Sequence, residues 1–150
     1  MFRQEGRDLM FDHKQTLGYL SAQLARRLAN ALRDGLTPLG LLPAQFTALA
    51  EIGADEGLAQ KQLVERLGLE QPGVARTLAG LEAMGWIERR NGTSGRSLGL
   101  YLSARARATL PRALEIAAGI DRRALAGAGR TERALLLDQL AQLGRTGSGE

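Results

Sequence analysis

Two short helical patterns with almost no chain between them are the feature that most constrains how this 150-residue sequence folds. The first pattern stops at Gly68, a residue type that often terminates helices. Only Leu69 and Glu70 follow before the second pattern, which has Pro72 in its first turn and Gly85 at its close. Two short helices joined by so tight a turn predict a helix-turn-helix.

A β-hairpin is expected directly after the second helix. Residues 86–89 and 98–102 are the predicted strands, and in the second strand leucines alternate with other residues, so that one face is buried. The connection over residues 91–95 is rich in turn-forming residues and suits a flexible hairpin loop. Another helix, with Pro43 in its first turn, precedes the pair. These elements together predict a winged helix-turn-helix lobe over residues 42–103.

Further helices are expected on both sides of this lobe. Residues 12–36 carry a leucine stripe at helical spacing, and residues 104–144 read as two more helices with Ser103 and Thr131 as N-caps. Residues 145–150 are expected to form a disordered tail. The chain, residues 1–150, is therefore predicted to be a single domain, mainly α-helical with a small β-hairpin wing.

The flanking helices are predicted to mediate dimerisation. The lobe buries its own core, which leaves the apolar faces of helices 12–36 and 104–144 with too little surface to pack against. A second copy of the chain supplies that surface, and a two-fold dimer is the commonest closed arrangement. Folding back onto the same lobe is the alternative, and it suits so long a first helix less well. The expected dimerisation residues are Leu17, Leu20, Leu24, Leu28, Leu136 and Leu140.

Basic residues are concentrated around the predicted hairpin. The whole chain has a net charge of only +4, and nearly all its basic residues are arginines, a bias that phosphate recognition and genomic coding explain equally well. Between residues 86 and 112 the excess is much stronger, because Glu88 is the only acid there. The six basic residues of that segment are Arg89, Arg90, Arg96, Arg105, Arg107 and Arg112.

The second helix of the pair and the hairpin provide candidate DNA contacts. A winged helix-turn-helix presents the first turn of this helix to base edges in the major groove, where the Gln71 amide suits adenine. Gly73 allows close approach, and Arg76 on the outer face suits guanine or phosphate. Arg89, Arg90 and Arg96 are expected to contact phosphates or the minor groove from the wing. Taken alone, either Gln71 or Arg76 would favour ordinary solvated helix surface, and it is their position together with the basic wing that favours DNA contact.

Catalysis and metal binding are not expected. The chain has no cysteine and a single histidine, which excludes thiolate chemistry, disulfides and zinc sites of the Cys or His type. Acids such as Glu51, Asp55, Glu56 and Glu65 stand without a neighbouring nucleophile or ligand group. No apolar run approaches the length of a membrane span, so a cytoplasmic protein without cofactors is predicted.

The order of these elements resembles the MarR family of transcriptional regulators. The resemblance is carried by LPAQFTALAEIGADEGLAQKQLVERLGLEQPGVARTLAGLEAMGWIERR, the Gly95-Arg96 pair and Leu102-Ser103. It implies a homodimer that binds pseudo-palindromic operator DNA as a repressor. It also implies release by a small effector, often aromatic or anionic, bound between the dimerisation helices and the lobe. By position, Arg76 matches the family's recognition-helix arginine and Arg96 its wing-tip arginine.

Four positions depart from the family pattern. Gly95 replaces an Asp before the wing arginine, Gly73 and Ala75 replace Ser or Thr in the recognition helix, and Ala59 replaces a Ser or Thr cap. A winged-helix protein-interaction module without sequence-specific DNA binding is therefore the alternative function. The sequence does not identify an effector-binding residue, since its aromatic residues suit ordinary packing.

Overall fold

The computed structural model describes residues 12–92 and 97–146. The helices are α1 (Leu17–Leu36), α2 (Pro43–Ala54), α3 (Gln60–Leu67), α4 (Gln71–Ala83), α5 (Ala104–Ala124) and α6 (Arg130–Thr146). The strands β1 (Ile87–Asn91) and β2 (Leu98–Leu102) form an antiparallel hairpin, and short 3-10 turns lie at η1 (His13–Gln15) and η2 (Thr37–Leu39). The predicted fold class, mainly α-helical with a small β-hairpin wing, is confirmed.

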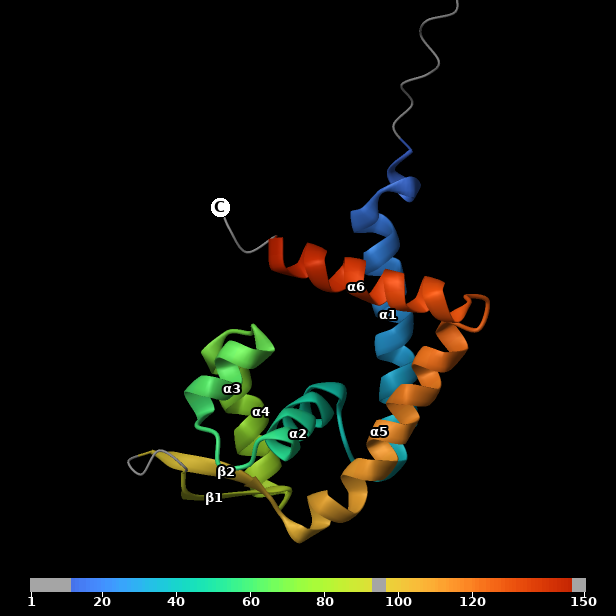
Figure 1. The fold of residues 1–150 in the computed structure, drawn as a ribbon. Coiled ribbons are helices and arrows are strands. Elements are labelled where there is room, and N and C mark those ends of the chain that lie inside the picture. The colour runs from blue at the N-terminus through green and yellow to red at the C-terminus, as the bar shows by residue number, and fades with distance from the viewer. Residues whose placement is uncertain (1–11, 93–96, 147–150) are drawn as a thin grey trace, which may run out of the picture.

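The molecule has a lobe and an extended helical part (Figure 1). Helices α2, α3 and α4 and the hairpin gather in the lobe, while α1 and α5 run along each other away from it. Helix α6 turns back at the end of α5 that is remote from the hairpin.

The hydrophobic core lies inside the lobe and extends into the first half of α5. Its fully buried large side chains come from the end of α1, from α2, α3 and α4, from β2, and from the connections before α3 and β1: Leu36, Leu49, Ile52, Leu58, Leu63, Leu78, Leu81, Trp86 and Leu100. Ala106, Leu110 and Ala113 of α5 belong to the same core. The start of α5 is therefore fixed to the lobe, whereas the rest of α5 leaves it.

Helix α1 begins five residues later than its predicted start at residue 12. The Asp12 carboxylate accepts a hydrogen bond from the backbone N–H of Lys14 (2.9 Å), which stabilises the 3-10 turn η1 instead. The Thr16 hydroxyl accepts from the N–H of Tyr19 (3.2 Å) and so caps α1. Side-chain oxygens at both positions thus satisfy backbone donors and set the boundary.

Both ends of α6 also differ from prediction. The Glu132 carboxylate accepts from the N–H of Gly129 (2.8 Å), so the cap lies at Gly129 and the predicted cap Thr131 is inside the helix. The helix continues through Thr146, past the predicted start of a disordered tail at residue 145. A glycine inside a helix costs only about 1 kcal/mol, so Gly144 does not end α6. Residues 147–150 of the predicted tail lie outside the described residues.

The hairpin is joined along the free edge of β2 by the chain between α2 and α3. Strand β1 starts at Ile87, one residue after the prediction, and runs to Asn91. The N–H of Gly57 donates to the Leu100 carbonyl and the N–H of Leu100 donates to the Leu58 carbonyl, both at 2.9 Å. A Cβ added at Gly99 would lie 2.6 Å from the Gly57 carbonyl oxygen. Only glycine fits at this crossing of backbones.

Candidate nucleic-acid interface

Helix α4 buries one face and exposes the other. Val74, Leu78 and Leu81 are buried in the lobe, and Gly85 adopts a positive φ of 73° that ends the helix. Gln71, Gly73 and Arg76 are all exposed. The buried triplet thus directs the opposite, polar face of α4 to solvent, as a recognition helix requires.

The exposed face of α4 is free of internal contacts at the predicted site residues. Arg76 forms no ion pair or side-chain hydrogen bond with any residue that the structure describes, and neither does Gln71. A Cβ added at Gly73 would meet no atom within 4 Å. The start of α4 therefore leaves the Arg76 guanidinium, the Gln71 amide and the backbone at Gly73 accessible to a binding partner.

Arg89 lies on the opposite face of β1 from Arg90. The strand register pairs Arg89 with buried Leu100, so the Arg89 side chain points toward α3 and α4. Its Nε donates to the Glu82 carboxylate (3.1 Å) and its Nη1 donates to the Gln60 side-chain oxygen (3.2 Å). Arg89 therefore joins the wing to both helices of the helix-turn-helix, a role that its position in the sequence did not indicate.

Arg90 is the described wing arginine that faces solvent. Its side chain is 57% exposed, its guanidinium carbon lies 4.1 Å from the centre of the Tyr101 ring, and Glu88 is 3.8 Å away. The aromatic contact keeps the guanidinium extended over the outer face of the hairpin. Arg96, predicted at the wing tip, lies outside the described residues.

Arginines at the start of α5 bind groups of their own chain. Arg105 donates to the Met84 carbonyl at the end of α4 (2.8 Å) and stacks over the Trp86 ring at 3.8 Å. Arg107 donates to both carboxylate oxygens of Glu56 at 2.7 and 2.8 Å. Much of the basic excess around the hairpin thus serves to hold the lobe together.

Glu56 is the carboxylate that pairs with Arg107 of α5, although in the sequence it stands without a neighbouring ligand group. Besides Arg107, it accepts a hydrogen bond from the N–H of Leu102 (2.9 Å), where β2 ends. Burial raises the pKa of the Glu56 carboxyl, but the hydrogen bonds from Arg107 and Leu102 and the charges of Arg107 and Arg90 outweigh it and lower the pKa overall. No local pattern reveals a partner 51 residues away.

The extended part of the molecule exposes many leucines. Leu17, Leu20 and Leu24 of α1 are 60%, 46% and 45% exposed. On α6, Leu136 and Leu140 are 40% and 42% exposed, and Leu135, Leu137 and Leu143 are exposed as well. Leu28, also predicted at a dimer interface, is half-buried on the side of α1 that faces α5.

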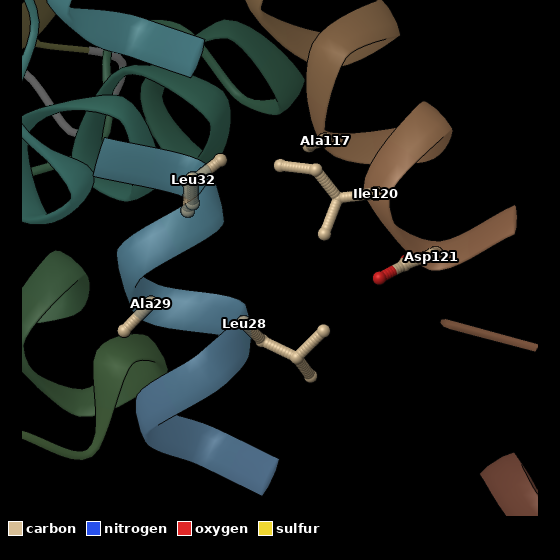
Figure 2. Close-up of a pocket in the computed structure, with 6 residues that line it drawn as sticks. All are labelled: Leu28, Ala29, Leu32, Ala117, Ile120 and Asp121. Carbon is tan, nitrogen blue, oxygen red and sulfur yellow. The ribbon is translucent and has the colours of Figure 1, made fainter. Parts of the chain in front are cut away.

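A small pocket lies between α1 and α5 (Figure 2). Its volume is about 140 Å³, and the side chains of Leu28, Leu32, Ile120 and Asp121 extend toward the space between the two helices. Ala29 and Ala117 complete the lining, in which Asp121 is the one ionisable residue. Elsewhere in residues 12–92 and 97–146, no three His, Cys, Asp or Glu side chains gather as a metal site would need. None of the described helices is long and apolar enough to cross a membrane.

Comparison with known proteins places this arrangement in a family. A family model described as MarR matches residues 39–97. The chain is 32% identical over 111 residues to the HTH-type transcriptional repressor Rv2887 of Mycobacterium tuberculosis, a match that spans 73% of this chain and 80% of that protein. The chain belongs to the MarR family. Members of this family are DNA-binding transcriptional regulators rather than enzymes.

Other MarR-like proteins give the same assignment. The uncharacterized HTH-type transcriptional regulator YwoH of Bacillus subtilis is 35% identical over 74 residues, which cover 49% of this chain and about half, 54%, of that protein. The repressor CouR bound to p-coumaroyl-CoA has a TM-score of 0.79 and 30% identity, with 91% of this chain and 96% of that chain covered. CouR bound to a 23-mer DNA duplex has a TM-score of 0.78 and 32% identity, with 87% and 94% covered.

Three of the four positions at which this MarR chain departs from the family pattern lie in or next to the helix-turn-helix. Ala59 precedes α3 without a capping hydroxyl, but the Gln62 side-chain oxygen accepts from the N–H of Ala59 (2.8 Å) and supplies a cap from within the helix. Gly73 leaves open space on α4, and Ala75 is half-buried. Gly95 lies outside the described residues. The helix-turn-helix is therefore intact without the hydroxyl that is common before α3.

Proposed function

We propose that the protein is a homodimeric transcriptional repressor that binds pseudo-palindromic operator DNA and releases it when a small ligand binds. The observation that carries the proposal is the exposed face of α4, where Arg76 and Gln71 have no internal partner. Two relatives support the proposal. Rv2887 is a transcriptional repressor, and CouR has been solved bound to a DNA duplex. We propose that the protein acts in the cytoplasm.

Base recognition would come from α4 and phosphate contact from the wing. The Arg76 guanidinium suits the two acceptors of guanine, and the Gln71 amide suits adenine. Open space at Gly73 lets the backbone of α4 approach the base edges. Arg90, on the outer face of β1, and Arg96 would contact phosphates.

Dimerisation would occur through α1 and α6. Exposed leucines gathered on these two helices favour an interface, since soluble proteins rarely leave large apolar patches uncovered. A two-fold axis between these helices would present two α4 helices to successive major-groove segments, which lie about 34 Å apart on one side of the duplex. Arg76 and Gln71 of each protomer would then read one half of a pseudo-palindrome.

The pocket between α1 and α5 is our candidate effector site. A cavity of about 150 Å³ accommodates a single benzene ring, so a volume of about 140 Å³ suits one aromatic ring. CouR with p-coumaroyl-CoA and Rv2887 with salicylic acid are relatives solved with aromatic ligands. In this chain Asp121 repels a carboxylate, which favours an aromatic ligand that is uncharged or carries a hydrogen-bond donor.

The test is selection of bound fragments from genomic DNA, followed by titration of the selected and a scrambled duplex at several salt concentrations. A specific regulator should prefer the selected duplex by about 10³-fold or more. Equal affinity for both duplexes would exclude the repressor proposal and favour a protein-interaction module.

A further inference from the structure

We infer that Arg89 fixes the position of the wing relative to the recognition helix and does not itself contact DNA. The inference rests on the proposed DNA-binding function. It assigns Arg89 as a positioning residue for DNA recognition and leaves Arg90 as the phosphate contact of β1. The two arginines are adjacent in sequence, so each is the natural control for the other.

Backbone hydrogen bonds to Leu100 and the buried side chains of the hairpin already hold one face of the wing, and Arg89 adds a link close to the sharp turn between the wing and α4. Helix α4 ends at Ala83, and Gly85, in the left-handed region, redirects the chain before β1 begins at Ile87. Rotation about one or two backbone bonds at this turn would change the angle between hairpin and helix. A side-chain bridge across the turn restricts that rotation further, beyond the limits that the core contacts of the hairpin set.

The contacts of Arg89 form this bridge. Glu82, in the last turn of α4, accepts from the Arg89 Nε at 3.1 Å, and Gln60, in the first turn of α3, accepts from Nη1 at 3.2 Å. One guanidinium therefore connects β1, α3 and α4. The planar fork of arginine holds its donors in fixed directions toward both acceptors, whereas the ammonium donors of lysine rotate on a flexible stem and are less well placed to bridge the two.

The side chains of Arg89 and Arg90 differ in how accessible they are to solvent. The Arg89 side chain is 25% exposed and paired with a carboxylate, whereas that of Arg90 is 57% exposed on the outer face. A phosphate at Arg89 would have to displace Glu82 or lie beside its negative charge. Arg90 is less restricted, because its ion pair with Glu88 is longer, at 3.8 Å, and both of these side chains are 57% exposed.

The conservative variants Arg89→Lys and Glu82→Gln give opposite outcomes under the two roles. If Arg89 positions the wing, both variants should weaken binding to the selected duplex about three- to tenfold while leaving the salt dependence of binding unchanged. If Arg89 contacts phosphate, Arg89→Lys should bind like the wild type. Glu82→Gln should then bind more tightly with a steeper salt dependence, because it frees the guanidinium.

The control is Arg90→Gln, which should reduce the slope of log affinity against log salt by about 1 in each subunit. The single variants Arg89→Glu and Glu82→Arg should each lose affinity for the selected duplex. The double variant, in which the two charges are exchanged, should recover part of that loss. The emission of the single tryptophan, Trp86, and the thermal midpoint verify that each variant is folded.

A second measurement does not depend on DNA. In the free protein, the amides of residues 87–91 should exchange hydrogen about three- to tenfold faster in Arg89→Lys and Glu82→Gln than in the wild type, with Arg90→Gln unchanged. Unchanged exchange in both variants overturns the inference. Exchange could be faster in the variants while the wild type shows no preference for any duplex. That result would confirm the positioning contact and reject the repressor function.

Discussion

Glu56 joins the connection between α2 and α3 to the end of β2 and the first turns of α5, through Leu102 and Arg107. Its folded pKa is lowered from the usual 4.5, so the bond contributes stability above about pH 4.5. That contribution is lost as the pH falls through the lowered folded pKa. We therefore expect the free energy of unfolding to decline in acid partly because of this one group.

The Glu56→Gln variant tests this. It should lose on the order of 1 kcal/mol of stability at pH 7, because the charge-assisted bonds to a half-exposed arginine are replaced by neutral ones. Its stability should then depend less on pH below 4.5 than that of the wild type. Urea unfolding between pH 7 and pH 3 measures both effects, and parallel curves for the two proteins would contradict the assignment.

At the same scale, Arg76 and Gln71 carry the predicted base contacts. Arg76→Ala and Gln71→Ala should each lose about 1–3 kcal/mol on the selected duplex and relax the preference at particular base pairs. Arg112→Ala is the charge-matched control for Arg76→Ala, since Arg112 pairs with Glu115 on α5. Duplex titrations with single base-pair changes give the result. If both variants bind the selected duplex with wild-type affinity, α4 is not the helix that contacts the bases.

At the scale of elements, two glycines with opposite environments give a matched pair of predictions. Gly99→Ala places a methyl group 2.6 Å from the Gly57 carbonyl oxygen, and should destabilise the packing of β2 on the chain between α2 and α3 by about 1–3 kcal/mol. Gly73→Ala meets no atom of the chain within 4 Å and should stabilise α4 by about 0.5–1 kcal/mol. Thermal unfolding of both variants checks the signs. Gly73→Ala should also show whether DNA approaches this site, because a close base contact would make the stabler variant bind more weakly.

The sequence predicts most elements here because periodicity and turn residues agree. Pro43, Gly68, Pro72 and Gly85 lie at helix ends as expected, and leucine alternation identifies β2. The boundaries that were wrong depend on single hydrogen bonds, such as those of Thr16 and Glu132.

The internal partners of the arginines were not predictable in the same way. Gln60 and Glu82 meet Arg89 only once the hairpin has folded against α3 and α4. The sequence shows that basic residues gather near residues 86–112 but not which of them the chain itself binds. A local charge count therefore overstates the number of arginines available to DNA.

At the scale of the whole molecule, the proposed dimer makes a direct prediction. The double variant Leu20→Asp, Leu24→Asp should yield monomer or aggregate, because each large leucine lost from a buried seam costs on the order of 2–5 kcal/mol. Leu69→Asp is the control, since Leu69 is 58% exposed in the connection between α3 and α4. Light scattering gives the mass of each. A dimer that persists in the double variant would exclude this part of α1 from the interface.

Because Arg89, Arg105 and Arg107 bind groups of their own chain, fewer of the arginines that the structure describes around the wing remain to displace the cations that surround DNA. Attachment to random chromosomal sequence depends almost wholly on that displacement, so it should be brief and readily reversed. The protein would then search the genome by frequent release and rebinding rather than by long slides along one segment. Its dwell time at an operator would depend on the few base contacts of α4, and a single base-pair change there would be enough to shorten it.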